Sequence, residues 1–188
     1  MAKLPLSLAA LAVSATTVLA PGLVAPASAH ESHGDYSWGV RLGERAENTI
    51  DARNVGLAEV GTARVKTWDD DVFVSFPVVG TRYTRTSGYD RDRITLLAGG
   101  VRFRGAQTET WRRLRVNEET NRVTALVDGV RRPVLRFADE CGGFGSRGTW
   151  DGDHRGTALR LTRAGQASLD RAAGANVFWR GEVFAWAR

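Results

Sequence analysis

The sequence is short of the residues that most often build disulfide, metal and catalytic sites. Its 188 residues include one cysteine, Cys141, and three histidines. A lone cysteine excludes an internal disulfide, so the folded chain must be held together by packing. Lysine is also scarce, since Lys3 and Lys66 are the two in the chain, and the formal net charge of +5 therefore rests on arginine. Arginine suits planar, bidentate contact with carboxylate or phosphate.

The long uncharged run of the chain lies at its N-terminus. Lys3 precedes an apolar stretch over 4–20, and Ala27, Ser28 and Ala29 form a small-residue cleavage site. This order predicts a signal peptide over 1–29 that is removed on export. No later stretch approaches the length of a membrane span, so we expect a secreted, extracellular or surface-associated protein without a transmembrane segment after cleavage.

The remaining residues, 30–188, have a length suited to one domain. Apolar residues alternate with polar ones, as at Val123, Ala125 and Val127, and this pattern predicts half-buried strands. Further strands are expected over 36–42, 60–68, 72–76, 94–97, 101–104, 111–116, 130–137, 158–161 and 177–186. The predicted fold class is all-β, a mainly antiparallel sandwich or barrel, with one short C-terminal helix over 163–173, which Thr162 begins and Gly174 ends.

Several short motifs occur in an order similar to that of the HtaA domain, a secreted or surface haem-binding domain of actinobacteria that serves iron acquisition. The motifs are Trp38-Gly39-Val40, the stretch 73–77 with Gly80 and Tyr83, the stretch 99–105, Leu161-Thr162 with Ala164-Gly165, and Gly181-Glu182. The resemblance spans most of 30–188. It implies a β domain and a secreted ligand-binding function, with haem as the cofactor.

The chain departs from that family at both expected iron ligands. The stretch 43–48 lacks the usual tyrosine, and Ala106 follows Gly105 where the family has a histidine. Since haem iron needs an axial donor, a retained site would have to recruit one of four other residues: Tyr36, Tyr83, Tyr89 and His154. A divergent member that has lost haem is the alternative.

Two further features could contribute to ligand binding. A glycine-rich loop is expected over 139–157, and Trp150 within it is a candidate for stacking on a ligand. The other five tryptophans, including Trp68 and Trp179, fall on predicted strands and are expected in the core. Arginines alternate out of several predicted strands: Arg102 and Arg104, Arg113 and Arg115, and Arg131 or Arg132 with Arg136. Neighbouring strands could thus present a guanidinium face to haem propionates or acidic wall polymers, whereas export argues against nucleic acid. The alternative is a mixed, solvated surface.

Metal and catalytic sites receive weaker support. His30 and His33 would begin the processed chain and could chelate Cu(II), although a solvated, frayed terminus explains them better. Asp69 to Asp71 fit a solvated turn better than a calcium loop. Cys141 and His154 lack a recognisable catalytic context, so no enzymatic activity is expected.

Two functions follow from the sequence. The first is a secreted ligand-binding module, with haem as the candidate ligand in iron acquisition. The second is a structural or protein-interaction domain of the cell envelope that has lost haem binding. The first predicts an apolar pocket with a tyrosine or histidine at its mouth, and the second predicts an exposed apolar or arginine patch.

Overall fold

A computed structural model describes residues 36–85, 91–138 and 156–187 of the chain. These residues form two helices and eleven strands, all of them paired antiparallel: β1 (Ser37–Leu42), α1 (Glu44–Ala52), β2 (Gly56–Val60), β3 (Arg64–Trp68), β4 (Asp71–Arg85), β5 (Arg91–Leu97), β6 (Gly100–Arg104), β7 (Thr108–Asn117), β8 (Arg122–Val127), β9 (Val130–Phe137), β10 (Thr157–Leu161), α2 (Arg163–Ala173) and β11 (Val183–Ala187). The all-β prediction is confirmed.

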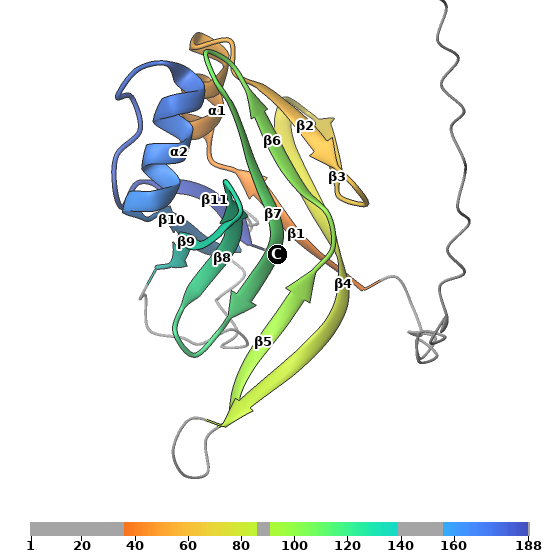
Figure 1. The fold of residues 1–188 in the computed structure, drawn as a ribbon. Helices are drawn as coiled ribbons and strands as arrows, with labels where there is room; N and C mark the ends of the chain where they lie inside the picture. Colours follow the sequence, from red (N-terminus) through yellow and green to blue (C-terminus); the bar gives the residue numbers. More distant parts are fainter. Residues whose placement is uncertain (1–35, 86–90, 139–155, 188) are drawn as a thin grey trace, which may run out of the picture. The chain divides into compact units, whose positions relative to one another are not determined.

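Eight of the strands close into a barrel. The ring runs β7, β5, β4, β1, β11, β10, β9 and β8, and β8 pairs with β7 again. The other three strands lie outside this ring. β6 pairs with the part of β7 that extends beyond β5, and β2 pairs with β6. β3 pairs with β4 (Figure 1). Of the two architectures expected from the sequence, the structure is the barrel.

Alternation and turn chemistry explain the strands. In β8, Val123, Ala125 and Val127 are buried while the residues between them are half-buried. β8 turns into β9 through Asp128 and Gly129, both with positive φ, as a two-residue hairpin turn requires. Asp69 and Asp70 likewise have positive φ between β3 and β4, so these carboxylates form the solvated turn expected from the sequence.

The sequence predicted one of the two helices and missed the other. α2 spans 163–173 as predicted; the Thr162 hydroxyl accepts from the Gly165 amide at 3.1 Å, and Gly174 has a φ of 69°. The prediction of a single helix was wrong, because α1 precedes β2. Its N-cap is Gly43, without a side-chain cap bond, and only Ala46 and Ile50 of the helix are buried. The sequence signals that announce a helix are therefore nearly absent.

Three predicted segments need other corrections. Of the stretch 60–68 only 64–68 is one strand, β3, because Val60 ends β2 and the chain turns at Gly61, where φ is 66°. Within 177–186 the strand is β11 alone, and the expected loop over 139–157 ends by 156 because β10 begins at Thr157.

Trp68 and Trp179 are 72% and 59% exposed, so the prediction that they are core residues was wrong.

The core fills the barrel with aromatic and aliphatic side chains. Trp111, Phe103 and Phe184 lie against one another, with ring centroids 5.0 to 6.3 Å apart. Trp111 and Phe103 are each 1% exposed, as expected for an eight-stranded barrel just wide enough for side chains. In Figure 1 α1 lies behind α2, and the segment that follows α2 contacts α1 where Trp179 meets Arg45. Within the described residues no helix is long and apolar enough to cross a membrane.

Candidate functional site

The described tyrosines do not form a shared site. Tyr36 is 75% exposed and Tyr83 is 62% exposed. The Tyr36 carbonyl accepts from the Val78 amide, and Tyr83 lies five residues further along β4, roughly 17 Å away at the rise of an extended strand. The structure thus separates the two candidate haem ligands and leaves both at the surface.

The other candidates lie outside the described residues: Tyr89, Trp150, His154, His30, His33 and Cys141. Within the described part of the chain, no group of three or more His, Cys, Asp or Glu side chains could hold a metal ion.

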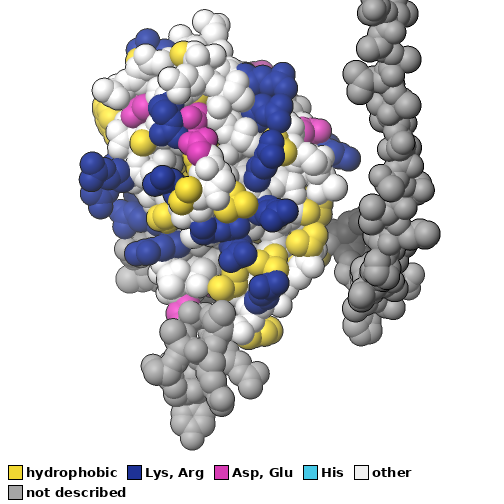
Figure 2. Space-filling model, viewed as in Figure 1, with side chains coloured by type: hydrophobic (Ala, Val, Ile, Leu, Met, Phe, Trp, Pro, Cys, Tyr) yellow, Lys and Arg dark blue, Asp and Glu magenta, His cyan; other side chains and the backbone are white. Residues whose placement is uncertain are grey.

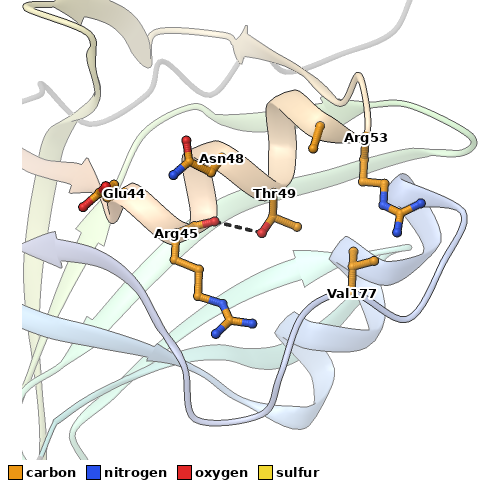
Figure 3. A pocket seen from close by; sticks show the side chains of 7 residues that line it. Glu44, Arg45, Asn48, Thr49, Arg53 and Val177 are labelled. Atoms are coloured by element: carbon orange, nitrogen blue, oxygen red, sulfur yellow. Dashed lines mark hydrogen bonds between the residues drawn. The ribbon is translucent and has the colours of Figure 1, made fainter.

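One surface hollow of about 560 Å³ lies beside α1 and is lined by Glu44, Arg45, Asn48, Thr49, Ala52, Arg53 and Val177. Figure 3 shows Arg45 and Arg53 extending from the helix toward the segment that carries Val177. The Arg45 guanidinium carbon lies 3.6 Å from the Trp179 ring centroid, and Arg45 Nε is 3.6 Å from a Glu182 carboxylate oxygen. These contacts tie Arg45 to the 177–182 segment, so the hollow is a polar helix–loop junction and differs from the apolar pocket expected for haem.

Glu182 is the buried acid of this junction. Its side chain is 6% exposed, and one oxygen, Oε2, accepts from the Trp179 amide at 3.0 Å. The other oxygen, Oε1, is buried without a hydrogen bond from the described residues. Burial, more than any neighbouring charge, raises the pKa of Glu182 above its ordinary value.

A group of arginines lies on the outer side of β7, β8 and β9. We call it the arginine-rich face and define it by Arg112, Arg113, Arg115, Arg122 and Arg131. In the register of the strands, Leu126 of β8 lies opposite Arg112 on one side and Arg131 on the other. Arg115 lies opposite Thr124, one step along. Directly opposed residues share a face of the sheet, so these side chains project together from the barrel.

β6 extends this surface at its edge. Arg102 is half-buried opposite Thr110 of β7, and Arg104 is exposed opposite Thr108. Arg102 and Arg104, the two arginines predicted as ligand-binding candidates, therefore lie on the strand that adjoins the arginine-rich face. Arg132, in contrast, pairs with the buried Ala125, so it belongs to the other side of β9. Figure 2 shows Lys and Arg side chains spread over the visible strands, with hydrophobic atoms between them.

None of the five arginines forms an ion pair with a carboxylate of the described residues, although Glu118 and Glu119 follow β7 in the turn that leads to Arg122. β8 and β9 contain no Asp or Glu, and the one acid of β7, Glu109, is 4% exposed and bonded to Arg171 of α2. Burial first, and then the positive charges of Arg115 and Arg113, lower the pKa of Arg131. The face is thus a cluster of cations that repel one another, and an anion placed on it would relieve that repulsion.

Sequence reasoning missed Arg112 and Arg122, and it treated Arg113 as an ordinary alternating residue. The signal for Arg113 was present in Trp-Arg-Arg-Leu-Arg-Val over 111–116. Trp111, Leu114 and Val116 are the buried residues of this run. Their spacing of three and then two interrupts the strand alternation and indicates a bulge with two consecutive arginines outside.

The chain was compared with protein-family models, with curated proteins and with solved structures. None of them matches it. The likeness to the HtaA domain therefore stays a prediction from the sequence.

Proposed function

We propose that the chain is a secreted, non-enzymatic binding module of the cell envelope that attaches to an anionic macromolecule through the arginine-rich face. One observation carries the proposal. Five arginines project from three adjacent strands, and none of them forms an ion pair with a carboxylate of the described residues. An uncompensated positive surface is what an acidic partner complements.

The spread of the charges favours a macromolecule over a small ion. Arg112 and Arg131 lie on strands separated by β8, so their backbones are about 10 Å apart at the usual strand spacing. Arg122 lies further along β8. A single small anion could reach only part of this set, whereas a polymer with repeated negative charges could contact all of it.

The same observations favour the interaction domain over the haem carrier. The barrel interior holds packed side chains, and the two described tyrosines are exposed and far apart along β4. A haemin titration of the secreted protein, followed at the Soret band, tests the alternative directly. A saturable one-to-one shift would overturn the preference for an interaction domain.

The main test uses fluorescently labelled anionic polymers and the mature protein recovered from an expressing host. We expect saturable binding to carboxymethyl-dextran, none to neutral dextran, and a steep loss of affinity between 50 and 200 mM salt, because association releases counterions.

A triple variant removes three charges from the face: Arg112→Gln, Arg115→Gln and Arg122→Gln. Its control removes three charges elsewhere: Lys66→Gln, Arg132→Gln and Arg163→Gln. We expect the first to weaken binding by ten-fold or more and the second by less than three-fold. Equal losses would mean that net charge alone drives association, and the arginine-rich face would then not be the site.

A further inference from the structure

Arg113 has an unusual backbone conformation within the arginine-rich face. Six non-glycine residues in the described part of the chain have a positive φ, and five of them are Asn or Asp. Arg113 is the sixth, with a φ of 49°, and it lies in the middle of β7. Side chains as large as arginine rarely adopt this region, and such outliers often mark functional sites.

The cause is a bulge in β7. The pairing with β8 shifts register between Arg112 and Arg115. As a result Arg112 and Arg113 are both exposed, although they are consecutive, while Trp111 and Leu114 are buried on either side. The Arg113 amide donates to the Gly99 carbonyl at 3.0 Å, which ties the bulge to the turn before β6. The bulge therefore places an extra guanidinium on the outer face.

The bulge also positions a second arginine. Arg131 Nη1 donates to the Arg113 carbonyl at 2.6 Å and lies 3.4 Å from both the carbonyl and the hydroxyl oxygen of Thr124. Arg131 is half-buried, so its guanidinium is held in place. Arg115 lies opposite Thr124 in the strand register, and the charges of Arg113 and Arg115 both act on Arg131, so the three arginines are neighbours on the outer face. Such preorganisation lowers the entropic cost of binding a ligand.

We propose that Arg113, Arg115, Arg131 and the Thr124 hydroxyl form a phosphate-binding site at the centre of the arginine-rich face, for phosphate monoester groups carried by the anionic partner. This inference rests on the proposed function and names the chemistry that the face recognises. A phosphate monoester offers three terminal oxygens and close to two negative charges, while a carboxylate offers two oxygens and one charge. Three guanidiniums match the first set better than the second.

The test compares two labelled dextrans of equal length and substitution, one carrying phosphate monoesters and the other carboxymethyl groups. At about 150 mM salt we expect the secreted protein to bind the phosphate polymer at least ten-fold more tightly. Raising the pH through about 6, where the phosphate gains its second charge, should widen the difference.

Arg113→Gly is the decisive variant, because glycine accepts a φ of 49° and keeps the carbonyl that holds Arg131. We expect it to abolish the phosphate preference, so that binding to the phosphate polymer weakens about ten-fold more than binding to carboxymethyl-dextran, which itself loses one charge of the face. Arg115→Lys, which keeps the charge and loses the planar fork, should reduce the preference as well. Arg132→Gln, on the other side of β9, should leave it intact.

The outcomes separate the two proposals. Equal affinity for both polymers, with saturable binding that depends on the face, would overturn the phosphate site and leave the proposed function standing. A phosphate preference that survives in both Arg113→Gly and Arg115→Lys would also overturn the site. Failure to bind either polymer would remove both proposals.

Discussion

Arg171 of α2 donates from Nε and Nη2 to the two carboxylate oxygens of Glu109 on β7, at 2.6 and 2.7 Å. The Ser168 hydroxyl donates to the same carboxylate at 2.7 Å and accepts from Trp111 Nε1 at 2.9 Å. The core tryptophan, the buried acid and the helix thus form one hydrogen-bonded network. Because each polar group in it has a partner, the network fixes α2 on the barrel without leaving an unpaired buried charge.

The two ends of this ion pair should differ in their effect on stability. Glu109 is 4% exposed, whereas the Arg171 side chain is 41% exposed. Arg171→Met leaves the buried Glu109 carboxylate without its cationic partner, and we expect a loss of about 3 kcal/mol in the free energy of unfolding. Glu109→Gln leaves an arginine that can turn toward water, so the expected loss is about 1 kcal/mol. Urea denaturation measures both. Arg163→Met, at the exposed start of α2, is the control, and a smaller loss for Arg171→Met than for Glu109→Gln would contradict this account.

Glu182 should give the stability a pH dependence above its ordinary pKa of 4.5. Burial raises its pKa in the folded protein, so the folded state holds the proton more tightly than the unfolded chain does. The free energy of unfolding should therefore fall as the pH rises from about 4.5 through the raised pKa. Glu182→Gln removes the contribution of Glu182 to this slope and should be more stable than the parent above that range, with the difference vanishing at lower pH.

Thermal unfolding across the acid range checks this expectation. Part of the slope should survive in Glu182→Gln, because burial also raises the pKa of Glu47. Arg45 and Asp170 act on Glu182 with opposite signs, so neither accounts for the direction. Identical pH profiles for parent and variant would show that Glu182 is not the titrating group.

Gly165→Ala should destabilise the protein, although alanine is the better helix former. A Cβ at this position would clash with the Val134 carbonyl of β9, so α2 would have to move away from the barrel. We expect a loss of about 2 kcal/mol or more, against a gain of roughly 1 kcal/mol in a helix without this constraint. Ala167→Gly, on the exposed side of α2, should cost about 1 kcal/mol through propensity alone. Chemical denaturation of both variants tests the sign, and a more stable Gly165→Ala would refute the close approach.

The tryptophans provide a further contrast. Trp111→Ala empties the middle of the core and should cost about 4 kcal/mol. Trp68→Ala, at the end of β3 and 72% exposed, should change the free energy of unfolding by less than about 0.5 kcal/mol. Equilibrium unfolding followed by circular dichroism measures the two without relying on tryptophan fluorescence. A large loss for Trp68→Ala would mean that this side chain is covered in solution.

Local patterns were enough to predict much of the barrel. The alternation at Val123, Ala125 and Val127 and the Asp128-Gly129 turn identify the β8–β9 hairpin, and Thr162 with Gly174 delimits α2. These signals work because they depend on a few neighbouring residues. α1 lacks them, since its short helix is stabilised by tertiary contacts of Ala46 and Ile50, which no local pattern announces.

The candidate site was less predictable, for a physical reason. Alternation assigned arginines to the outer side of separate strands, but only the register of β7, β8 and β9 brings Arg112, Arg115 and Arg131 together. The bulge at Arg113 is a tertiary feature as well, although the paired arginines in the sequence hint at it. The prediction that Trp68 and Trp179 are core residues was wrong because the sequence around a hydrophobic residue at a strand end or in a loop does not indicate whether its side chain is buried.

The filled barrel separates the residues that keep this protein folded from those proposed to meet its partner. Inward positions such as Trp111 and Val123 carry the packing, while outward positions of the same strands carry the arginines. Substitutions at exposed positions usually change stability by no more than about 0.5 kcal/mol. The proposed recognition surface can therefore be changed by substitution while the barrel stays the same, so binding specificity can be altered with little cost in folding stability.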